Sequence, residues 1–327
     1  MKKLSIILLS AFLIAQNVFA RQAAFNGQNY SINLSYNETA SPGDAVFMRM
    51  KVTRSKSGKA DLSAFTARLE LFVDGKAVRS SDFYNLGKAS KAGKTMLTGV
   101  PLSTWWTKEN KCQLKIVYSI SEEEKKEFTL PFYLDNKSFI SETIKLDESN
   151  TAIKTDTSTK RMEQISRLNS ILETINPQNV YSLKPFKLPV ESARRTSYFS
   201  DRRVYEYTGG SSSTSLHNGI DFGVPTGTEV RCASEGKVVL AEDRISTGFS
   251  VVVEHLPGLY SLYYHMNELK VKAGDNVKAG TLLGYSGATG LATGPHLHWE
   301  VRLNLEAVNP DFFTQNFAFE PGEDQKN

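Results

Sequence analysis

Apolar and polar residues alternate along several short runs in the first part of the chain. Within residues 67–73 every second residue is apolar, and residues 112–120 repeat this period of two. Alternation of this kind puts the apolar side chains of a β-strand on one face. Asp74 and Gly75, which follow the first run, form a strong signal for a hairpin turn. Short strands at this spacing predict a small β-sandwich over residues 21–137.

The pattern becomes helical between residues 138 and 190. Residues 146–160, LDESNTAIKTDTSTK, are polar and typical of a linker. Apolar residues then recur at a spacing of three and four residues: Met162, Ile165, Leu168, Ile171, Leu172 and Ile175. We expect one amphipathic helix that ends before Pro177 and packs on a neighbouring domain. The pattern is too short to support the coiled-coil seam of a self-associating helix.

Residues 191–313 return to strand-like runs and are richer in glycine. The runs include TEVRCA, GKVVLAED, FSVVVEHL, YSLYYHM and HLHWEVRL, and turn signals separate them. We therefore expect an all-β chain with an N-terminal sandwich, a short helical linker and a C-terminal β-domain. Residues 314–327 predict a frayed C-terminal tail.

The first twenty residues, MKKLSIILLSAFLIAQNVFA, have the pattern of a leader. Two lysines precede an apolar stretch over residues 4–15, and Val18 and Ala20 fit a small-residue cleavage site. We expect a signal peptide over residues 1–20, with export to the periplasm or cell envelope, or secretion. The apolar stretch is shorter than the roughly 20 residues that span a bilayer, so we expect no stable membrane span after cleavage.

Charge and cysteine content exclude several classes of function. The 39 Lys and Arg residues nearly balance the 35 Asp and Glu residues, for a formal net charge of +4. This balance gives no electrostatic case for binding nucleic acid or a membrane surface. Cys112 and Cys232 fall in different predicted domains, so we expect two buried free thiols rather than a disulfide framework.

The chain's five histidines all lie in the C-terminal β-domain: His217, His255, His265, His296 and His298. Because a strand repeats its facing every two residues, His296, His298 and Glu300 share one face of the run HLHWEVRL. The residues between them are apolar and share the other face. Two imidazoles on the polar face of a strand are placed for chemistry in a cleft rather than for packing in a core.

His217 and Asp221 stand at the two ends of the run HNGID. In an extended strand they would lie roughly 13 Å apart, which is too far for two ligands of one ion. Asn218 and Gly219 can supply a tight bend that brings them together. Together with the H-x-H run in a chain that we expect to be exported, this pattern predicts a metal site.

Zinc chemistry accounts for these residue types. A catalytic zinc ion takes three protein ligands and keeps a fourth position for water, whose pKa it lowers. Three of the four residues His217, Asp221, His296 and His298 can complete this set. The fourth, together with His265, is then left for proton transfer and oxyanion stabilisation. The H-E-x-x-H motif of helical zinc proteases is absent from the sequence.

An ordered set of motifs covers about a third of the chain: SYFSDRR, HNGIDFGVPTGTEV, GKVV, LYYH, VKAGDNVKAGTLLGYSG, TGPHLHWEVR and VNP. In these motifs the chain resembles the M23 family of zinc metallopeptidases, the lysostaphin-type or LytM-type peptidoglycan endopeptidases. The resemblance implies an antiparallel β-sheet under a groove that holds one zinc ion per chain. It also implies that His217, Asp221 and His298 bind zinc, and that His265 and His296 are the catalytic pair.

The function implied by this resemblance is that of an exported zinc-dependent metalloendopeptidase. Its substrates would be the stem or cross-bridge peptides of bacterial peptidoglycan, with a zinc-activated water attacking the carbonyl. The division of roles between His265 and His296 stays open. The alternative is a latent or non-catalytic cell-wall-binding regulator of other hydrolases. Latency would arise if the N-terminal domain or the linker helix masked the groove.

Several further residues stand near these motifs. His255 ends a strand before a Pro-Gly turn, and we interpret it as structural. Glu300 is either an acceptor that orients a ligand imidazole or a solvated or salt-bridged strand residue. The segment VYEYTGGSSSTSL departs from the family pattern, so subsite preference there is open. Tyr205 and Tyr207 lie in that segment and are candidates for contact with the oxyanion.

Overall fold

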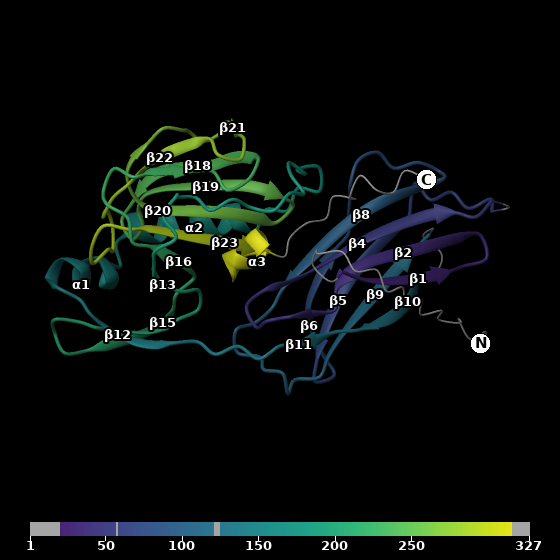
Figure 1. The fold of residues 1–327 in the computed structure, drawn as a ribbon, viewed down its shortest axis with the longest axis horizontal. Coiled ribbons are helices and arrows are strands. Elements are labelled where there is room, and N and C mark those ends of the chain that lie inside the picture. Colours follow the sequence, from purple (N-terminus) through teal and green to yellow (C-terminus); the bar gives the residue numbers. More distant parts are fainter. Residues whose placement is uncertain (1–19, 57, 121–124, 316–327) are drawn as a thin grey trace. The chain divides into compact units, whose positions relative to one another are not determined.

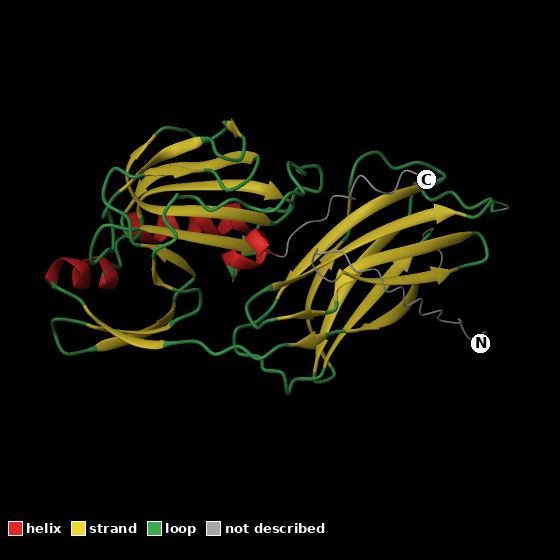
Figure 2. Cartoon of the chain, in the orientation of Figure 1, coloured by secondary structure: helices red, strands yellow, loops and turns green. Residues whose placement is uncertain are grey.

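The computed structural model describes residues 20–56, 58–120 and 125–315 (Figure 1). The chain divides into two compact units, Met1–Lys137 and Ser138–Asn327. Strands dominate both units (Figure 2), which confirms the predicted all-β class.

Two predicted segments lie largely outside the described residues. Residues 1–19, which make up nearly all of the predicted signal peptide, are one of them. Residues 316–327 of the predicted tail are the other. Within the described ranges, no helix is both long enough and apolar enough to cross a membrane.

The first unit is the predicted β-sandwich. One sheet runs, in spatial order, β1 (Ala20–Asn26), β2 (Tyr30–Asn37), β4 (Ala45–Arg54), β8 (Gly93–Pro101) and β7 (Tyr84–Asn85). The other runs β10 (Lys125–Pro131), β9 (Cys112–Ser119), β5 (Thr66–Val73) and β6 (Lys76–Asp82). A short parallel pair joins β3 (Thr39–Ala40) to β11 (Tyr133–Leu134). Buried side chains of both sheets form one hydrophobic core, among them Ile32, Met48, Leu69 and Ile116.

The β5–β6 hairpin confirms the predicted alternation. Every second residue from Ala67 to Val73 is buried, and the residues between them are more exposed. Asp74 and Gly75 form the turn with φ angles of 50° and 81°. Both angles are positive, as a two-residue turn that matches the twist of the strands requires. Cys112, at the start of β9, is a free thiol and is only partly buried.

The second unit is built on an antiparallel sheet. Its main path runs β13 (Arg195–Ser197), β16 (Gly219–Phe222), β23 (Leu297–Leu303), β20 (Leu259–Leu269), β19 (Gly248–Leu256), β18 (Gly236–Arg244) and β21 (Asn276–Val277). β22 (Leu282–Ser286) pairs with β20 and with β17 (Glu229–Arg231), and β24 (Glu306–Val308) pairs with β23. Helix α3 (Pro310–Gln315) follows β24 and buries Phe312 and Phe313.

A smaller sheet of the second unit contains a strand from the predicted linker. β14 (Arg202–Glu206) pairs antiparallel with β15 (Ser212–Leu216), and β12 (Ser141–Lys145) adds to β14 in parallel. Helix α1 (Glu148–Thr155) follows, and Asp147 caps it by accepting a hydrogen bond from the Asn150 amide. The polar stretch from which we expected no regular element therefore holds a helix.

Helix α2 (Thr159–Leu172) is the predicted amphipathic helix. Leu172 is buried against Leu240, Val252 and Leu262 of the sheet, and Leu168 packs beside it. The helix ends before Pro177, as expected, but it stops at Leu172, earlier than the apolar spacing indicates, and Ile175 is 53% exposed. Met162, near the N-terminus of the helix, is also exposed.

Candidate metal centre

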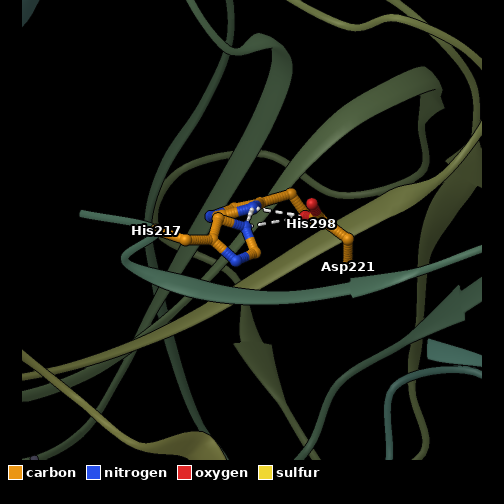
Figure 3. Close-up of side chains that lie close together, drawn as sticks. All are labelled: His217, Asp221 and His298. Atoms are coloured by element: carbon orange, nitrogen blue, oxygen red, sulfur yellow. Dashed lines mark hydrogen bonds and ion pairs between the residues drawn. The ribbon is translucent and has the colours of Figure 1, made fainter. Parts of the chain in front are cut away.

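Three polar side chains meet at adjacent strands of the second unit (Figure 3). Asp221 on β16 and His298 on β23 are direct cross-strand partners, and His217 lies just before β16. The Asp221 Oδ1 atom is 3.0 Å from His217 Nε2 and 2.7 Å from His298 Nδ1. The two ring nitrogens lie 3.0 Å apart. All three residues are buried, so the sequence prediction that His217 and Asp221 converge on the H-x-H run agrees with the geometry.

Gly219 makes this convergence possible, although not for the reason that we expected. Its backbone does not adopt the left-handed conformation that would mark a bend requiring glycine. Instead, a Cβ atom at Gly219 would lie 2.3 Å from the backbone oxygen of Trp299. The absence of a side chain thus lets β16 approach β23 closely, which brings Asp221 opposite His298.

Hydrogen bonds behind the two imidazoles fix how they face Asp221. His217 donates from Nδ1 to the Tyr198 carbonyl at 2.7 Å, so Nε2 presents its lone pair to the cluster. His298 donates from Nε2 to Glu300 Oε1 at 3.0 Å, so Nδ1 points at Asp221. Glu300 in turn accepts from Arg302 Nε at 2.7 Å. Glu300 is thus both an acceptor that orients His298 and a partner in an ion pair with Arg302, so it combines the two roles left open by the sequence.

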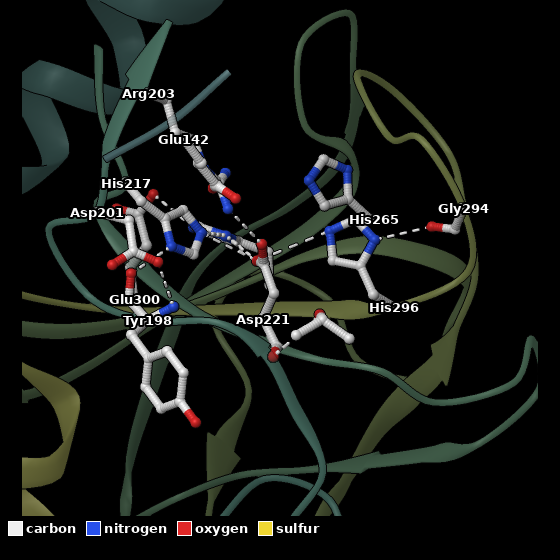
Figure 4. A network of polar contacts seen from close by, with 12 residues as sticks. Glu142, Tyr198, Asp201, Arg203, His217, Asp221, His265, Gly294, His296 and Glu300 are labelled. Carbon is white, nitrogen blue, oxygen red and sulfur yellow. Dashed lines mark hydrogen bonds and ion pairs between the residues drawn. The ribbon is translucent and has the colours of Figure 1, made fainter. Parts of the chain in front are cut away.

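Arg203 holds the other side of the Asp221 carboxylate. Its guanidinium donates to Asp221 Oδ2 at 3.0 Å and, through Nε, to Glu142 Oε1 at 2.7 Å (Figure 4). Arg203 lies on β14 and Glu142 on β12, so the strand that precedes α1 reaches the cluster through one arginine. Because Arg203 occupies Oδ2, the Oδ1 atom is left to face the two histidines.

Electrostatics show that the cluster attracts positive charge. Burial would raise the pKa of Asp221, but the close contacts with His217 and His298 outweigh it and hold that pKa well below its usual range. Burial would lower the pKa of His298, but hydrogen bonds to Asp221 and Glu300 outweigh it and raise the pKa to about 9. The proton that His298 holds against Asp221 occupies the place where a bound cation would provide the same positive charge.

The three donor atoms fit a small divalent cation. Two imidazole nitrogens and one carboxylate oxygen are typical zinc ligands. Four ligands at about 2.0–2.1 Å in a tetrahedron stand roughly 3.3 Å from one another. The observed separations of 2.7–3.0 Å need to widen by only a few tenths of an ångström.

His265 and His296 lie beside this cluster, with ring centroids 4.7 Å apart. His265 sits where β19 and β20 shift register, so that Tyr264 and His265 both stand opposite Ser250. The bulge gives His265 a φ of 59°, a left-handed conformation that costs a non-glycine residue about 1–3 kcal/mol. Backbone strain of this order is typical of functional sites.

Both histidines expose the same ring nitrogen. His265 donates from Nδ1 to the Thr289 carbonyl and His296 from Nδ1 to the Gly294 carbonyl, each at 2.8 Å. Burial lowers the pKa of His265 to about 3 and also lowers that of His296. Each imidazole is therefore neutral near pH 7, with the lone pair on Nε2. The His296 Nε2 atom lies 3.7 Å from Asp221 Oδ1.

A cleft of about 600 Å³ joins the five predicted site residues. Its lining also includes three charged residues that the sequence analysis did not assign: Glu142, Lys154 and Arg203. The alternation of Glu142, Ile144 and Leu146, which all line the cleft, is the signal that could have revealed β12 as a wall. Lys154 carries no comparable signal in the sequence.

The remaining candidates divide between the cleft and other parts of the unit. Tyr205 lines the cleft, whereas the Tyr207 hydroxyl is 2.5 Å from the Ser213 hydroxyl. His255 is fully buried, bonded through Nδ1 to the Glu235 carbonyl and through Nε2 to the Ser261 hydroxyl. It does not line the cleft, in keeping with the structural role expected for it.

Comparison with known proteins shows that part of the second unit is similar to a peptidase family. The model of peptidase family M23 matches residues 215–310. DD-carboxypeptidase/endopeptidase Mpg of Neisseria meningitidis is 40% identical over 95 residues, which are 29% of this chain and 22% of that protein. Peptidoglycan DD-endopeptidase ShyA of Vibrio cholerae is 37% identical over 124 residues, or 38% of this chain and 28% of that protein. The match thus spans less than a third of either relative.

A solved structure matches more of the chain. The crystal structure of a putative peptidase M23 from Pseudomonas aeruginosa has a TM-score of 0.52 and 25% sequence identity. The alignment covers 85% of this chain and 95% of that one. The family match lies within the second unit and includes all five predicted site residues that line the cleft. Over residues 215–310, the second unit is therefore similar to peptidase family M23.

Proposed function

We propose that this protein is an exported zinc metalloendopeptidase that hydrolyses peptide cross-links of bacterial peptidoglycan. The observation that carries the proposal is the meeting of five polar side chains in one cleft: His217, Asp221, His265, His296 and His298. The relative ShyA bears the name of a peptidoglycan DD-endopeptidase, which supports the substrate class.

His217, Asp221 and His298 are the proposed zinc ligands. When bound, a zinc ion supplies a Lewis acid that polarises a peptide carbonyl and lowers the pKa of water. The Tyr198 carbonyl and the Glu300 carboxylate hold the two imidazoles in the tautomers whose free nitrogens face Asp221. Such partners behind a ligand fix its orientation before the metal arrives.

His265 and His296 are the proposed proton carriers. Each commits Nδ1–H to a backbone carbonyl, so each can take up a proton at Nε2. One of them accepts a proton from the attacking water. An imidazole protonated at Nε2 is a donor, and from there it stabilises the developing oxyanion or protonates the leaving amine. The 4.7 Å between the two rings puts both within reach of one scissile bond.

Digestion of purified peptidoglycan tests this function. The full-length protein loaded with zinc should release muropeptides, whose masses identify the bond that is cut. A chelator should abolish the release, and added zinc should restore it. Cleavage that survives complete zinc removal, or no cleavage of several wall types by the zinc-loaded protein, would contradict the proposal.

Export needs its own experiment. Expression with residues 1–20 should place the protein in the periplasm, envelope or medium, and N-terminal sequencing should then find Arg21 first. Protein that stays in the cytoplasm with an intact N-terminus would contradict this part of the proposal.

A further inference from the structure

Helix α1 is bonded to a loop that lines the cleft and to a turn of the smaller sheet. On one side, the Asn150 side-chain amide donates to the Ala292 carbonyl at 3.3 Å, in the 291–295 loop that lines the cleft. On the other side, the Thr208 amide donates to the Thr151 hydroxyl at 3.4 Å, in the turn that joins β14 to β15. Figure 1 shows α1 beside this smaller sheet. Helix α1 therefore links the 291–295 loop to the sheet that carries Arg203 and Tyr205.

Helix α1 contributes one cation, Lys154, to the lining of the cleft. Lys154 of α1 lines the cleft, is half-buried, and holds its ammonium 4.3 Å from the ring centroid of Tyr205. Among the described residues, no carboxylate forms an ion pair with Lys154. Glu142, the acid that β12 contributes to the lining, forms an ion pair with Arg203.

Two arginines near Lys154 add to the positive charge in this part of the cleft. Burial, and after it the charges of Arg161 and Arg203, lower the pKa of Lys154. Arg161 is bonded to the Ser246 hydroxyl and to the Asp156 carbonyl, which are neutral groups. An ammonium has three donors, and a half-buried one is costly unless an acceptor of opposite charge meets it. The aromatic face of Tyr205 offsets part of that cost and leaves the donors to the cleft.

We propose that Lys154 of α1 binds a free carboxylate of the substrate in the cleft. This inference rests on the proposed function and narrows it. The substrate class is a wall peptide with an ionised carboxylate near the scissile bond, held by Lys154 while the carbonyl lies over the metal centre. Two sources share this chemistry: the carboxylate at the C-terminus of a peptide and a side-chain carboxylate within it.

Three matched peptides distinguish the sources. The first is a cross-linked muropeptide with its carboxylates free, the second has its C-terminal carboxylate converted to an amide, and the third has its side-chain carboxylates converted to amides. Full-length, zinc-loaded protein should cleave the first with the lowest KM. Whichever amide raises the KM about tenfold identifies the carboxylate that Lys154 holds, since a charged hydrogen bond contributes about that factor.

Two variants separate the role of Lys154 from structural effects. Lys154→Gln should raise the KM for the free peptide about tenfold, leave kcat unchanged, and leave the KM for the critical amide unchanged. Lys154→Arg should recover most of the difference. Lys145→Gln is the matched control, because Lys145 lies on β12 with an exposed side chain that does not line the cleft. It should behave as the native protein with all three peptides.

The possible results each decide the matter. A loss on free and amidated peptides alike, or no change on either, would overturn the assignment of Lys154. If the native protein cleaves none of the peptides, the proposed function fails, and calorimetric binding of the same three peptides still tests the subsite. A tenfold preference for the free carboxylate that Lys154→Gln removes would support the subsite without catalysis, and equal binding would overturn it.

Discussion

Each unit has its own core built from strands, and the two units differ in the partners of their buried polar groups. In the first unit, the buried Lys94 donates to the carbonyls of Ser63 and Phe65, and its charge serves to hold a loop. In the second unit, buried acids and imidazoles face one another across neighbouring strands, as Asp221 and His298 do. Buried polar residues therefore indicate a functional site when several titratable side chains line one cleft. A single buried polar side chain that bonds only to the backbone indicates a structural role.

The same lesson holds between two histidines of the second unit. His255 and His298 are both buried, but His255 meets a carbonyl and a hydroxyl, and His298 meets two carboxylates. Burial lowers the pKa of His255 to about 4, whereas the carboxylates raise that of His298 to about 9. Partners, rather than burial, therefore separate the site histidine from the structural one.

The largest expected effect is a loss of peptidoglycan cleavage when a proton carrier is removed from the cleft. Replacing His265 with asparagine, which tolerates the left-handed backbone, removes a proton carrier and should lower kcat for peptidoglycan cleavage about 10³-fold. Zinc content should stay that of the native protein, because His265 is not a proposed ligand. Activity within tenfold of native would place the proton transfer elsewhere.

The next effect breaks the first unit without touching the second. Leu69→Ala empties part of the sandwich core and should lower the free energy of unfolding of that unit by about 3 kcal/mol. Leu240→Ala is the matched change in the second core. Calorimetry should show each variant shifting a different transition. Cleavage by Leu69→Ala below its transition should equal native cleavage, and a parallel loss would show that the units are coupled.

A pH effect sharpens the contrast between histidines. The pKa of His255 is lower in the folded protein than its usual value of 6.5, so the unfolded chain binds the proton first as pH falls. Stability is then lost progressively from about pH 6.5 towards pH 4, and the loss at pH 5 should be about 2 kcal/mol.

Urea unfolding at pH 7 and pH 5 measures this effect in the transition assigned to the second unit. His255→Gln keeps a polar side chain and should remove about 2 kcal/mol of the pH dependence, whatever its stability at pH 7. An unchanged pH dependence in this variant would show that another group titrates.

The smallest effect concerns the support behind the metal centre. Arg203→Met frees Asp221 Oδ2 and should weaken zinc binding about tenfold in a competition titration with a chelator. Glu142→Gln, one contact further away, should weaken it less. Arg202→Met is the control, since Arg202 stacks on Phe139 and bonds to Ser200. Equal zinc affinities in all three variants would show that Arg203 does not support zinc binding.

Local pattern predicted much of the fold. The alternation at Ala67–Val73 and the Asp74-Gly75 turn predicted the β5–β6 hairpin, because burial and turn geometry there depend on near neighbours. The apolar spacing did not locate the end of α2, because it continues to Ile175 after the backbone has left the helix at Leu172. Helix α1 was missed because a polar sequence gives no periodicity, and contacts with Ala292 and Thr208 stabilise it instead.

The centre of the site was also predicted from sequence, but not its support. The spacing of His217, Asp221 and His298 is a local property of two strands, and the structure brings them together. Glu142 and Arg203 stand 61 residues apart and meet through parallel pairing of β12 with β14, which no local pattern specifies. Side chains that are brought together by the pairing of distant strands are therefore missed when each segment is analysed by itself.

Zinc content tests the central claim most directly. The account predicts that elemental analysis of the purified full-length protein finds one zinc ion per chain, and that His298→Ala and Asp221→Ala each lose it while Lys145→Gln retains it. A native protein that takes up no zinc, or variants that keep a full equivalent, would contradict the claim that these side chains hold the metal.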